Sequence, residues 1–132
     1  MLLNLSNHPY GTWQKDQYQA AEKLFGGVVD MPFPNVDPNA DETEIMEMAE
    51  AYFQKIQTEY DTGIAAVHLM GELCFCFALA RLLQGIGIKV VASTTERKVI
   101  EQGEGQKTVV FHFIRFREYV KPSLYHSHHL RN

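Results

Sequence analysis

The sequence has few of the features that mark whole classes of protein. Only two of its 132 residues are cysteine, Cys74 and Cys76. On a helix this spacing places them about 200° apart, where they cannot easily form a disulfide with each other. No apolar run approaches the roughly 18 residues of a membrane span, and the first residues lack the regions of a signal peptide. We therefore expect a cytoplasmic protein with reduced, buried cysteines.

Positive charge and common catalytic motifs are also scarce. The formal net charge is −4, which argues against binding to duplex nucleic acid because such binding needs a broad basic face. The sequence contains neither a P-loop nor the glycine-flanked serine of α/β-hydrolases. Its two cysteines are wrongly spaced for a zinc site. We expect no metal and no cofactor.

The composition that remains is that of a globular domain. Hydrophobic residues make up 45% of the chain and charged residues 21%, and a chain of this length can form one ordinary hydrophobic core. We expect a single domain over residues 1–120 and a flexible, histidine-rich tail over 121–132. Cations gather in the last third of the chain, whereas residues 37–61 are strongly acidic. A local positive pocket for a small anion is compatible with this distribution.

Hydrophobic periodicity predicts alternating strands and helices. The most informative junction is 64–72, where an apolar strand containing His68, expected to be a hydrogen-bonded core residue, turns at Gly71 into a nearly all-apolar helix. Expected strands cover 2–5, 28–31, 64–70 and 88–92, expected helices cover 12–25, 41–60 and 72–84, and a hairpin at 103–105 joins 98–102 to 108–119. We predict a doubly wound, Rossmann-like, mostly parallel α/β sheet of order 2-1-3-4 with an antiparallel edge.

The candidate site is the set of polar residues that follow the predicted strand ends. In an open α/β sheet, ligands bind outside the carboxyl ends of the strands, where the winding reverses. The candidate ligand-binding residues are Ser6, Asn7, Gly71, Ser93, Thr94 and Thr95, and the candidate catalytic residues are His8, Glu72 and Arg97. Hydroxyls, backbone N–H groups and a guanidinium on one rim suit a phosphate-bearing ligand.

Each of these residues also has a structural interpretation. Ser6 and Asn7 can cap a helix or form a turn, and His8 can be an ordinary loop residue. Glu72 can complement the dipole of the helix that it begins, which stabilises by roughly 0.3–1 kcal/mol. The threonines suit a strand, and Arg97 can belong to a surface ion pair.

Four short motifs resemble a known group of proteins. They are NLSNHP (4–9), MGE (70–72), ASTTER (92–97) and FIRFREY (113–119). Together they resemble a small family of bacterial CRISPR-associated or uncharacterised proteins, similar to the compact Rossmann-like CARF proteins and stand-alone ring nucleases. The resemblance covers residues 1–120.

The resemblance implies a homodimer that binds a cyclic oligoadenylate, a second messenger of antiviral defence, and cleaves it without a metal. A ribose 2′-hydroxyl would be held in line with the neighbouring phosphate while positive groups stabilise the transition state. On this sequence, the resemblance implies that Ser6 and Asn7 hold the ligand and that Gly71 offers backbone donors. It also implies that Thr95 and Arg97 bind phosphate.

Three other hypotheses remain open. Glu72 departs from what an all-anion site prefers, and it would contact a ribose hydroxyl or an adenine amine, or act as the base of a different nucleotide-processing enzyme. The same pocket can belong to a sensor that binds a nucleotide without turnover. The chain can also be a structural partner in a larger complex.

Overall fold

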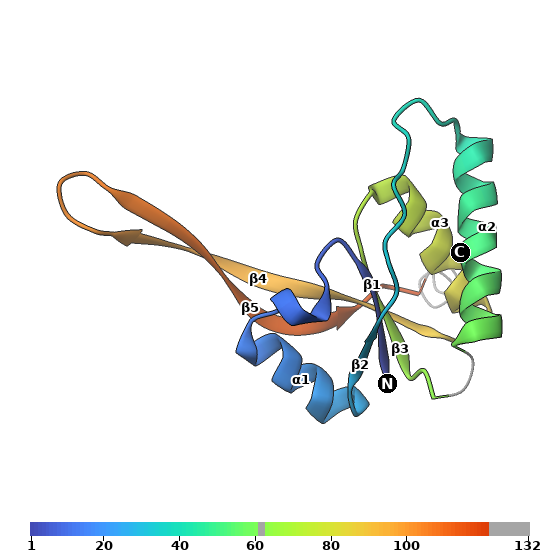
Figure 1. Cartoon of the computed structure of the whole chain (residues 1–132), viewed down its shortest axis with the longest axis horizontal. Coiled ribbons are helices and arrows are strands. Elements are labelled where there is room, and N and C mark those ends of the chain that lie inside the picture. The colour runs from blue at the N-terminus through green and yellow to red at the C-terminus, as the bar shows by residue number, and fades with distance from the viewer. Residues whose placement is uncertain (61–62, 122–132) are drawn as a thin grey trace, which may run out of the picture.

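The computed structural model describes residues 1–60 and 63–121, which form a mixed five-stranded sheet with three α-helices (Figure 1). The strands are β1 (Leu2–Ser6), β2 (Val28–Asp30), β3 (Ala66–Met70), β4 (Lys89–Glu101) and β5 (Lys107–Glu118). The helices are α1 (Lys15–Phe25), α2 (Glu42–Glu59) and α3 (Leu73–Gly85), with a short 3-10 helix at Tyr10–Thr12. The predicted histidine-rich tail lies outside the described residues.

The sheet confirms the predicted fold class. Its strand order is β2-β1-β3-β4-β5. The pairs β1–β2, β1–β3 and β3–β4 are parallel, and β4–β5 is antiparallel. This is a Rossmann-like arrangement with an antiparallel edge strand. None of the helices in the described ranges is long and apolar enough to cross a bilayer.

The two faces of the sheet are covered by different helices, and the alternation of side chains along β1 shows why. Leu3 and Leu5 belong to the larger core, which contains Phe75 and the inner sides of α2 and α3. Leu2 belongs to a smaller core that contains Trp13 and the inner side of α1. In Figure 1, α1 accordingly lies apart from α2 and α3. We refer to the face under α1 as the α1 face.

Helix ends follow from local sequence. The Asp41 side chain accepts a hydrogen bond from the backbone N–H of Glu44 at 2.9 Å, which confirms the capping-box-like start predicted for α2. The first helix begins at Lys15, later than expected, because Trp13 and the N-cap Gln14 have extended backbone conformations. That extended step turns the Trp13 side chain into the smaller core instead of along the helix.

The main departure from the sequence-based expectation is the length of β4. The sequence predicts that this strand ends at Ala92 and that Ser93 to Arg97 form a loop beyond it. The structure shows one continuous strand to Glu101, paired with β5 along its length. The β-branched residues of this segment, Thr94, Thr95, Val99 and Ile100, are favourable in such a two-stranded ribbon. The predicted loop is wrong, and these polar residues lie on a strand.

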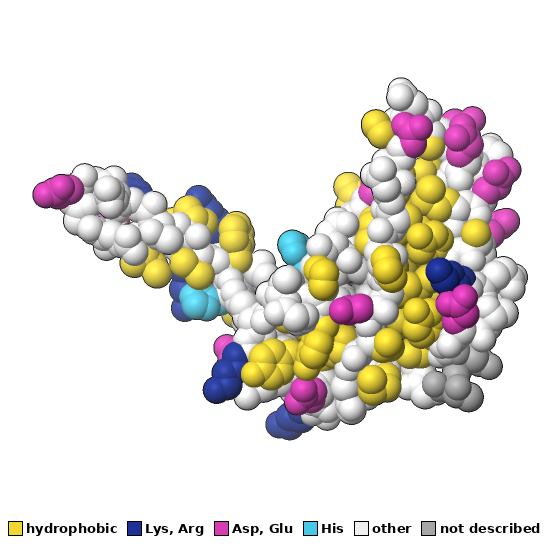
Figure 2. Space-filling view, in the orientation of Figure 1, with side chains coloured by type: hydrophobic (Ala, Val, Ile, Leu, Met, Phe, Trp, Pro, Cys, Tyr) yellow, Lys and Arg dark blue, Asp and Glu magenta, His cyan; other side chains and the backbone are white. Residues whose placement is uncertain are grey.

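Beyond this point β4 and β5 form an arm that projects from the body of the molecule (Figure 1). The register runs from Thr95 opposite Phe113 to Glu101 opposite Lys107, with a β-bulge between Thr94 and Thr95. The predicted turn at 103–105 is confirmed, since all three of its residues have positive φ angles. Figure 2 shows hydrophobic side chains along the arm and acidic side chains over the outer surface of α2.

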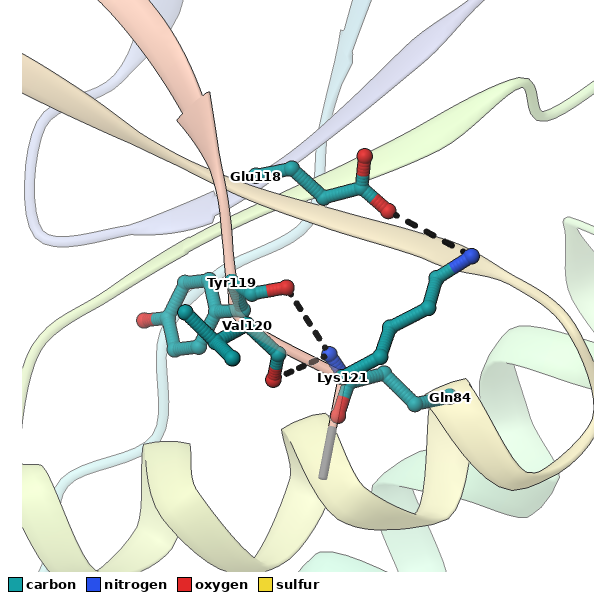
Figure 3. A network of polar contacts seen from close by, with 5 residues as sticks. All are labelled: Gln84, Glu118, Tyr119, Val120 and Lys121. Carbon is teal, nitrogen blue, oxygen red and sulfur yellow. Dashed lines mark hydrogen bonds and ion pairs between the residues drawn. The ribbon is translucent and has the colours of Figure 1, made fainter. Parts of the chain in front are cut away.

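The other end of β5 is tied to α3 (Figure 3). The side-chain amide of Gln84 donates to the carbonyl oxygens of Tyr119 and Val120 at 3.2 and 3.3 Å. Lys121 Nζ lies 3.6 Å from the Glu118 carboxylate. The Tyr119 hydroxyl donates to the Leu69 carbonyl at 2.6 Å, and its partial burial raises the pKa of Tyr119 to about 12. These contacts fix the base of the arm against the sheet.

Candidate functional site

A row of polar side chains crosses the α1 face of the sheet. Asn4 on β1 lies in register with Asp30 on β2 and with His68 on β3. His68 is in register with Val91 on β4, and Ser93 follows two residues later on the same face. The row therefore runs over four neighbouring strands, through side chains that are distant in the sequence.

Asn4 is the centre of this row, and its amide makes four hydrogen bonds. Its Nδ2 donates to Asp30 Oδ1 and to the His8 carbonyl oxygen, both at 2.9 Å. Its Oδ1 accepts from Ser6 Oγ at 2.8 Å and lies 2.9 Å from His68 Nδ1. The opposite amide orientation would place Oδ1 against two acceptor oxygens. The partners of Asn4 therefore fix which way its amide points.

This orientation also fixes the tautomer of His68. Because Asn4 Oδ1 can only accept, the proton of a neutral His68 ring must reside on Nδ1. Nε2 is then an acceptor, and it lies 2.7 Å from Ser93 Oγ. Ser93 Oγ in turn accepts a hydrogen bond from Gln17 Nε2 at 3.0 Å. The hydroxyl of Ser93 is consequently left to donate its own proton toward His68.

The surroundings of His68 favour the neutral imidazole. The residue is 2% exposed, and the edges of Trp13 and Phe116 pack against it with ring centroids 5.1 and 5.6 Å away. Burial lowers the pKa of His68 to about 4, with a further contribution from the charge of nearby His8. At neutral pH the ring is therefore uncharged, and the lone pair of its Nε2 can accept a hydrogen bond from Ser93.

A cavity of about 420 Å³ opens directly onto this histidine and serine. It lies between the start of α1 and the base of the arm. Its lining consists of His8, Thr12, Trp13, Gln14, Gln17, His68, Met70, Ser93, Thr95, Phe111 and Phe113. The Gln14 side chain bonds to the backbone of Phe111 and Phe113 on the free edge of β5, which holds α1 beside the arm. We call this cavity the α1 cleft.

The structure brings three of the residues predicted from sequence into the α1 cleft. His8, Ser93 and Thr95 all line it. Arg97 follows Thr95 by two residues and pairs with Phe111, so it lies on the same face of the arm, just beyond the cleft. Its location differs from the predicted rim loop because β4 continues.

Three other predicted residues lie outside the cleft. Thr94 is on the opposite face, where its hydroxyl bonds to the backbone of Arg115 at the bulge. Ser6 is buried behind the cleft and bonds to Asn4 and to the backbone of His8, so it supports the site without lining it. Asn7 is exposed in the turn after β1. The turn interpretation explains Ser6 and Asn7 better than direct ligand contact.

Glu72 begins α3 as its N-cap, and this corrects the expectation of a shared rim. Its carboxylate accepts from the backbone N–H groups of Cys74 and Phe75 at 2.8 and 3.0 Å. Those hydrogen bonds lower the pKa of Glu72. The backbone donors expected to welcome an anion are thus occupied by a carboxylate of the chain itself. Glu72 does not line the α1 cleft, so the structure favours the helix-dipole interpretation over a catalytic base.

We predict that Glu72→Ala lowers stability and leaves ligand binding in the α1 cleft unchanged. Loss of an N-cap typically costs about 0.5–2 kcal/mol of unfolding free energy. Urea unfolding measures this loss, and Glu47→Ala, on an exposed position in the middle of α2, is the control with the same change of charge. A binding defect in the Glu72 variant alone would return this residue to the site.

Gly71 has a steric role. A Cβ atom at this position would lie 2.2 Å from Cζ of Phe33, whose ring packs edge-on against Phe75 at 5.4 Å between centroids. We expect Gly71→Ala to destabilise the fold by about 1–3 kcal/mol, the range for overpacked cores. Gly85→Ala is the matched control, because no atom of the residues that the structure describes lies within 4 Å of a Cβ there. Equal melting temperatures for the two variants would contradict this assignment.

The cysteines do not form a chemical site. Cys74 is exposed, which corrects the expectation that both are buried, whereas Cys76 is buried and burial raises the pKa of its thiol to about 12. In residues 1–60 and 63–121, no three His, Cys, Asp or Glu side chains gather as a potential metal site.

A second, larger cavity of about 730 Å³ lies between the start of α2 and α3. Its lining is mostly apolar, including Ile45, Leu73 and Phe77.

Sequence reasoning missed the centre of the site. The sequence pattern places Asn4 and His68 on buried strands, with His68 in the core, and it places Trp13 and Gln17 on a helix without indicating a site. One signal is present in the sequence: Asn4 and Ser6 occupy alternate positions in the apolar segment 2–6, and His68 is the polar residue within the apolar segment 66–70. A polar stripe on a buried face indicates hydrogen-bonded partners across the sheet.

Comparison with known proteins assigns the chain to a protein family. No curated protein and no solved structure matches the chain. One family model, described as the uncharacterized protein MJ1673 family, matches residues 1–117. This match spans all of β1 to β4 and nearly all of β5, including every residue that lines the α1 cleft. The chain therefore belongs to the MJ1673 family.

Proposed function

We propose that this protein binds a cyclic oligoadenylate, or a related nucleotide with a phosphodiester backbone, in the α1 cleft and cleaves it without a metal. The observation that carries the proposal is a chain of hydrogen bonds that links the side chains of Asn4, His68 and Ser93. It presents a serine hydroxyl and a neutral imidazole to an open cavity. A buried polar row that ends at a cavity is more than core packing requires.

The walls of the α1 cleft suit a nucleotide. Trp13, Phe111 and Phe113 supply aromatic surface on which a base can stack. Gln17 and Thr95 offer hydrogen-bonding groups beside that surface. Aromatic rings beside polar side chains are typical of sites that bind unpaired bases.

Positive charge is available at the outer end of the same surface. Arg97 is exposed and lies on the cleft face of the arm opposite Phe111. Its guanidinium can reach a phosphate whose base lies in the cleft, and guanidinium groups bind phosphate oxygens in pairs. His8 also lines the cleft and offers a further hydrogen-bonding group there. The negative net charge of the chain is therefore no obstacle to an anionic ligand.

The direct test is incubation with radiolabelled cyclic tetra-adenylate, with and without EDTA. The proposal requires linear products that form at the same rate in EDTA. A His68→Gln variant serves as the inactive control, and its melting temperature shows that it is folded. Absence of both binding and product for cyclic and linear adenylates would refute the proposed function.

A sensor that binds the same ligand without turnover is the second candidate. One observation favours it: the partner of His68 is an amide, not a carboxylate, and burial lowers the pKa of this histidine to about 4. Both features weaken a general base. Saturable binding with an unchanged ligand after prolonged incubation would establish the sensor.

We also propose that the protein is a cytoplasmic homodimer. The arm exposes apolar side chains that a single chain leaves uncovered, among them Val99, Ile100, Val109 and Phe111. A two-stranded ribbon is marginally stable by itself, and exposed apolar surface of this kind commonly marks an association site. Light scattering coupled to size-exclusion chromatography measures the mass in solution, and a monomer at all concentrations would refute this proposal.

A further inference from the structure

We propose that Ser93 is the nucleophile of this protein and attacks the phosphorus atom of the bound phosphodiester, with His68 as its base and Asn4 as the positioning residue. The inference rests on the proposed function for its substrate class. It goes further by replacing the ribose 2′-hydroxyl, which the resemblance implies as the attacking group, with a side chain of the protein.

The geometry is that of an activated serine. Ser93 Oγ lies 2.7 Å from His68 Nε2, and His68 Nδ1 lies 2.9 Å from Asn4 Oδ1. A nucleophile bonded to a base, with the base oriented by a third group, is the arrangement shared by unrelated serine and cysteine hydrolases. An asparagine in third place occurs in the papain-like proteases.

An asparagine can serve here because its amide cannot turn. In a serine protease, exchanging the third residue for asparagine is damaging because the histidine adopts the wrong tautomer. In this protein Asp30 and the His8 carbonyl both accept from Asn4 Nδ2, so only Oδ1 faces His68. The histidine is therefore held with its proton on Nδ1 and its acceptor toward Ser93.

Ser93 is also accessible to a ligand. It is half-buried and lines the α1 cleft, whereas His68 behind it is almost completely covered. Gln17 Nε2 lies 3.0 Å from Ser93 Oγ, which places a neutral donor beside the oxygens of a phosphoryl group attached there. Ser6 and Asn7, by contrast, lie outside the cleft.

The reaction balances without a further reagent. Ser93 Oγ forms a bond to phosphorus as its proton passes to His68 Nε2, and the bond from phosphorus to the leaving ribose oxygen breaks. That oxygen takes the proton from His68. Water then attacks the phosphoserine, gives its proton to His68, and releases a terminal phosphate as the proton returns to Ser93.

A fluorophosphonate probe tests the nucleophile without any nucleotide. We expect a single covalent adduct on Ser93 of the full chain, identified by peptide mass spectrometry, with loss of fluoride. Ser93→Ala should give no adduct, and His68→Gln should label at least about 100-fold more slowly because its base is missing. Thr58→Ala is the control, since this hydroxyl bonds to the Gln54 carbonyl within α2 and lies outside the α1 cleft, and it should label normally.

A second measurement separates this inference from the proposed function. A ring of four 2′-deoxyadenylates has no ribose hydroxyl to attack, so its cleavage supports Ser93 as the nucleophile. Failure of wild-type protein to label, or an adduct that persists in Ser93→Ala, would overturn the inference. If the ribose ring is cleaved to a 2′,3′-cyclic phosphate by Ser93→Ala, the proposed function stands and the inference fails. If Ser93 is labelled but no adenylate is cleaved, Ser93 is a nucleophile and the proposed substrate is wrong.

Discussion

Replacing Arg97 with alanine should weaken binding of cyclic tetra-adenylate by more than about tenfold, because a charge-assisted hydrogen bond contributes roughly 1.5–3 kcal/mol. Arg97 lies on the cleft face of the arm, two residues after Thr95 on β4 and opposite Phe111 on β5. The side chain is exposed, so its removal should leave the melting temperature nearly unchanged. Isothermal titration calorimetry at two salt concentrations measures the loss.

The neighbouring Lys98 provides a matched control. It carries the same charge and is also exposed, but it pairs with Val110 on the opposite face of the arm. Lys98→Ala should therefore lower the affinity by less than about threefold, through the loss of long-range electrostatic attraction alone. This effect is small because salt screens exposed charges that do not contact the ligand. Equal losses for the two variants would show that the arm attracts anions without a specific phosphate contact. No loss for Arg97→Ala would remove this residue from the site.

The sheet could be predicted because its signals are local. Gly71 ends one apolar run and begins another with helical character, and Asp41 with Glu44 marks the start of α2. Strand order then follows from the handedness of crossovers. The length of β4 could not be predicted in this way, because its extension depends on pairing with β5 across the turn. Residues 93–97 are polar enough to form a loop when that partner is not considered.

The site was harder to predict because it depends on register. Nothing near Asn4 in the sequence indicates that Asp30 and His68 flank it, and the connection appears only when three strands are aligned. The topology of an open α/β sheet predicts a ligand site at the carboxyl ends of the strands, where helices begin with free backbone N–H groups. In this chain the N–H groups at the start of α3 are already bound by Glu72. The polar row and the α1 cleft lie instead on the α1 face of the sheet.

Between pH 7 and pH 5, the unfolding free energy should fall by about 2 kcal/mol through His68 alone, as calculated from a folded pKa of about 4 against the ordinary value of 6.5. The unfolded chain binds a proton at this position below pH 6.5, whereas the folded protein resists it down to about pH 4. The stabilising contribution is therefore complete above pH 6.5 and is lost as the pH falls through 4. Burial is the main cause, since the ring of His68 bonds to an amide and a hydroxyl and is enclosed by Trp13 and Phe116.

Urea unfolding at half-unit steps of pH measures this dependence, with the comparison made between slopes and not between absolute stabilities. His68→Gln can retain hydrogen bonds to Asn4 and Ser93 but cannot titrate, so its slope should be flatter than that of the wild type. His8→Gln is the matched control, because His8 lines the same cleft at an exposed position and should leave most of the slope in place. If His68→Gln and the wild type lose stability in parallel, folding does not lower the pKa of His68. The buried, neutral acceptor on which the proposed cleavage and the Ser93 nucleophile rest would then lose its support.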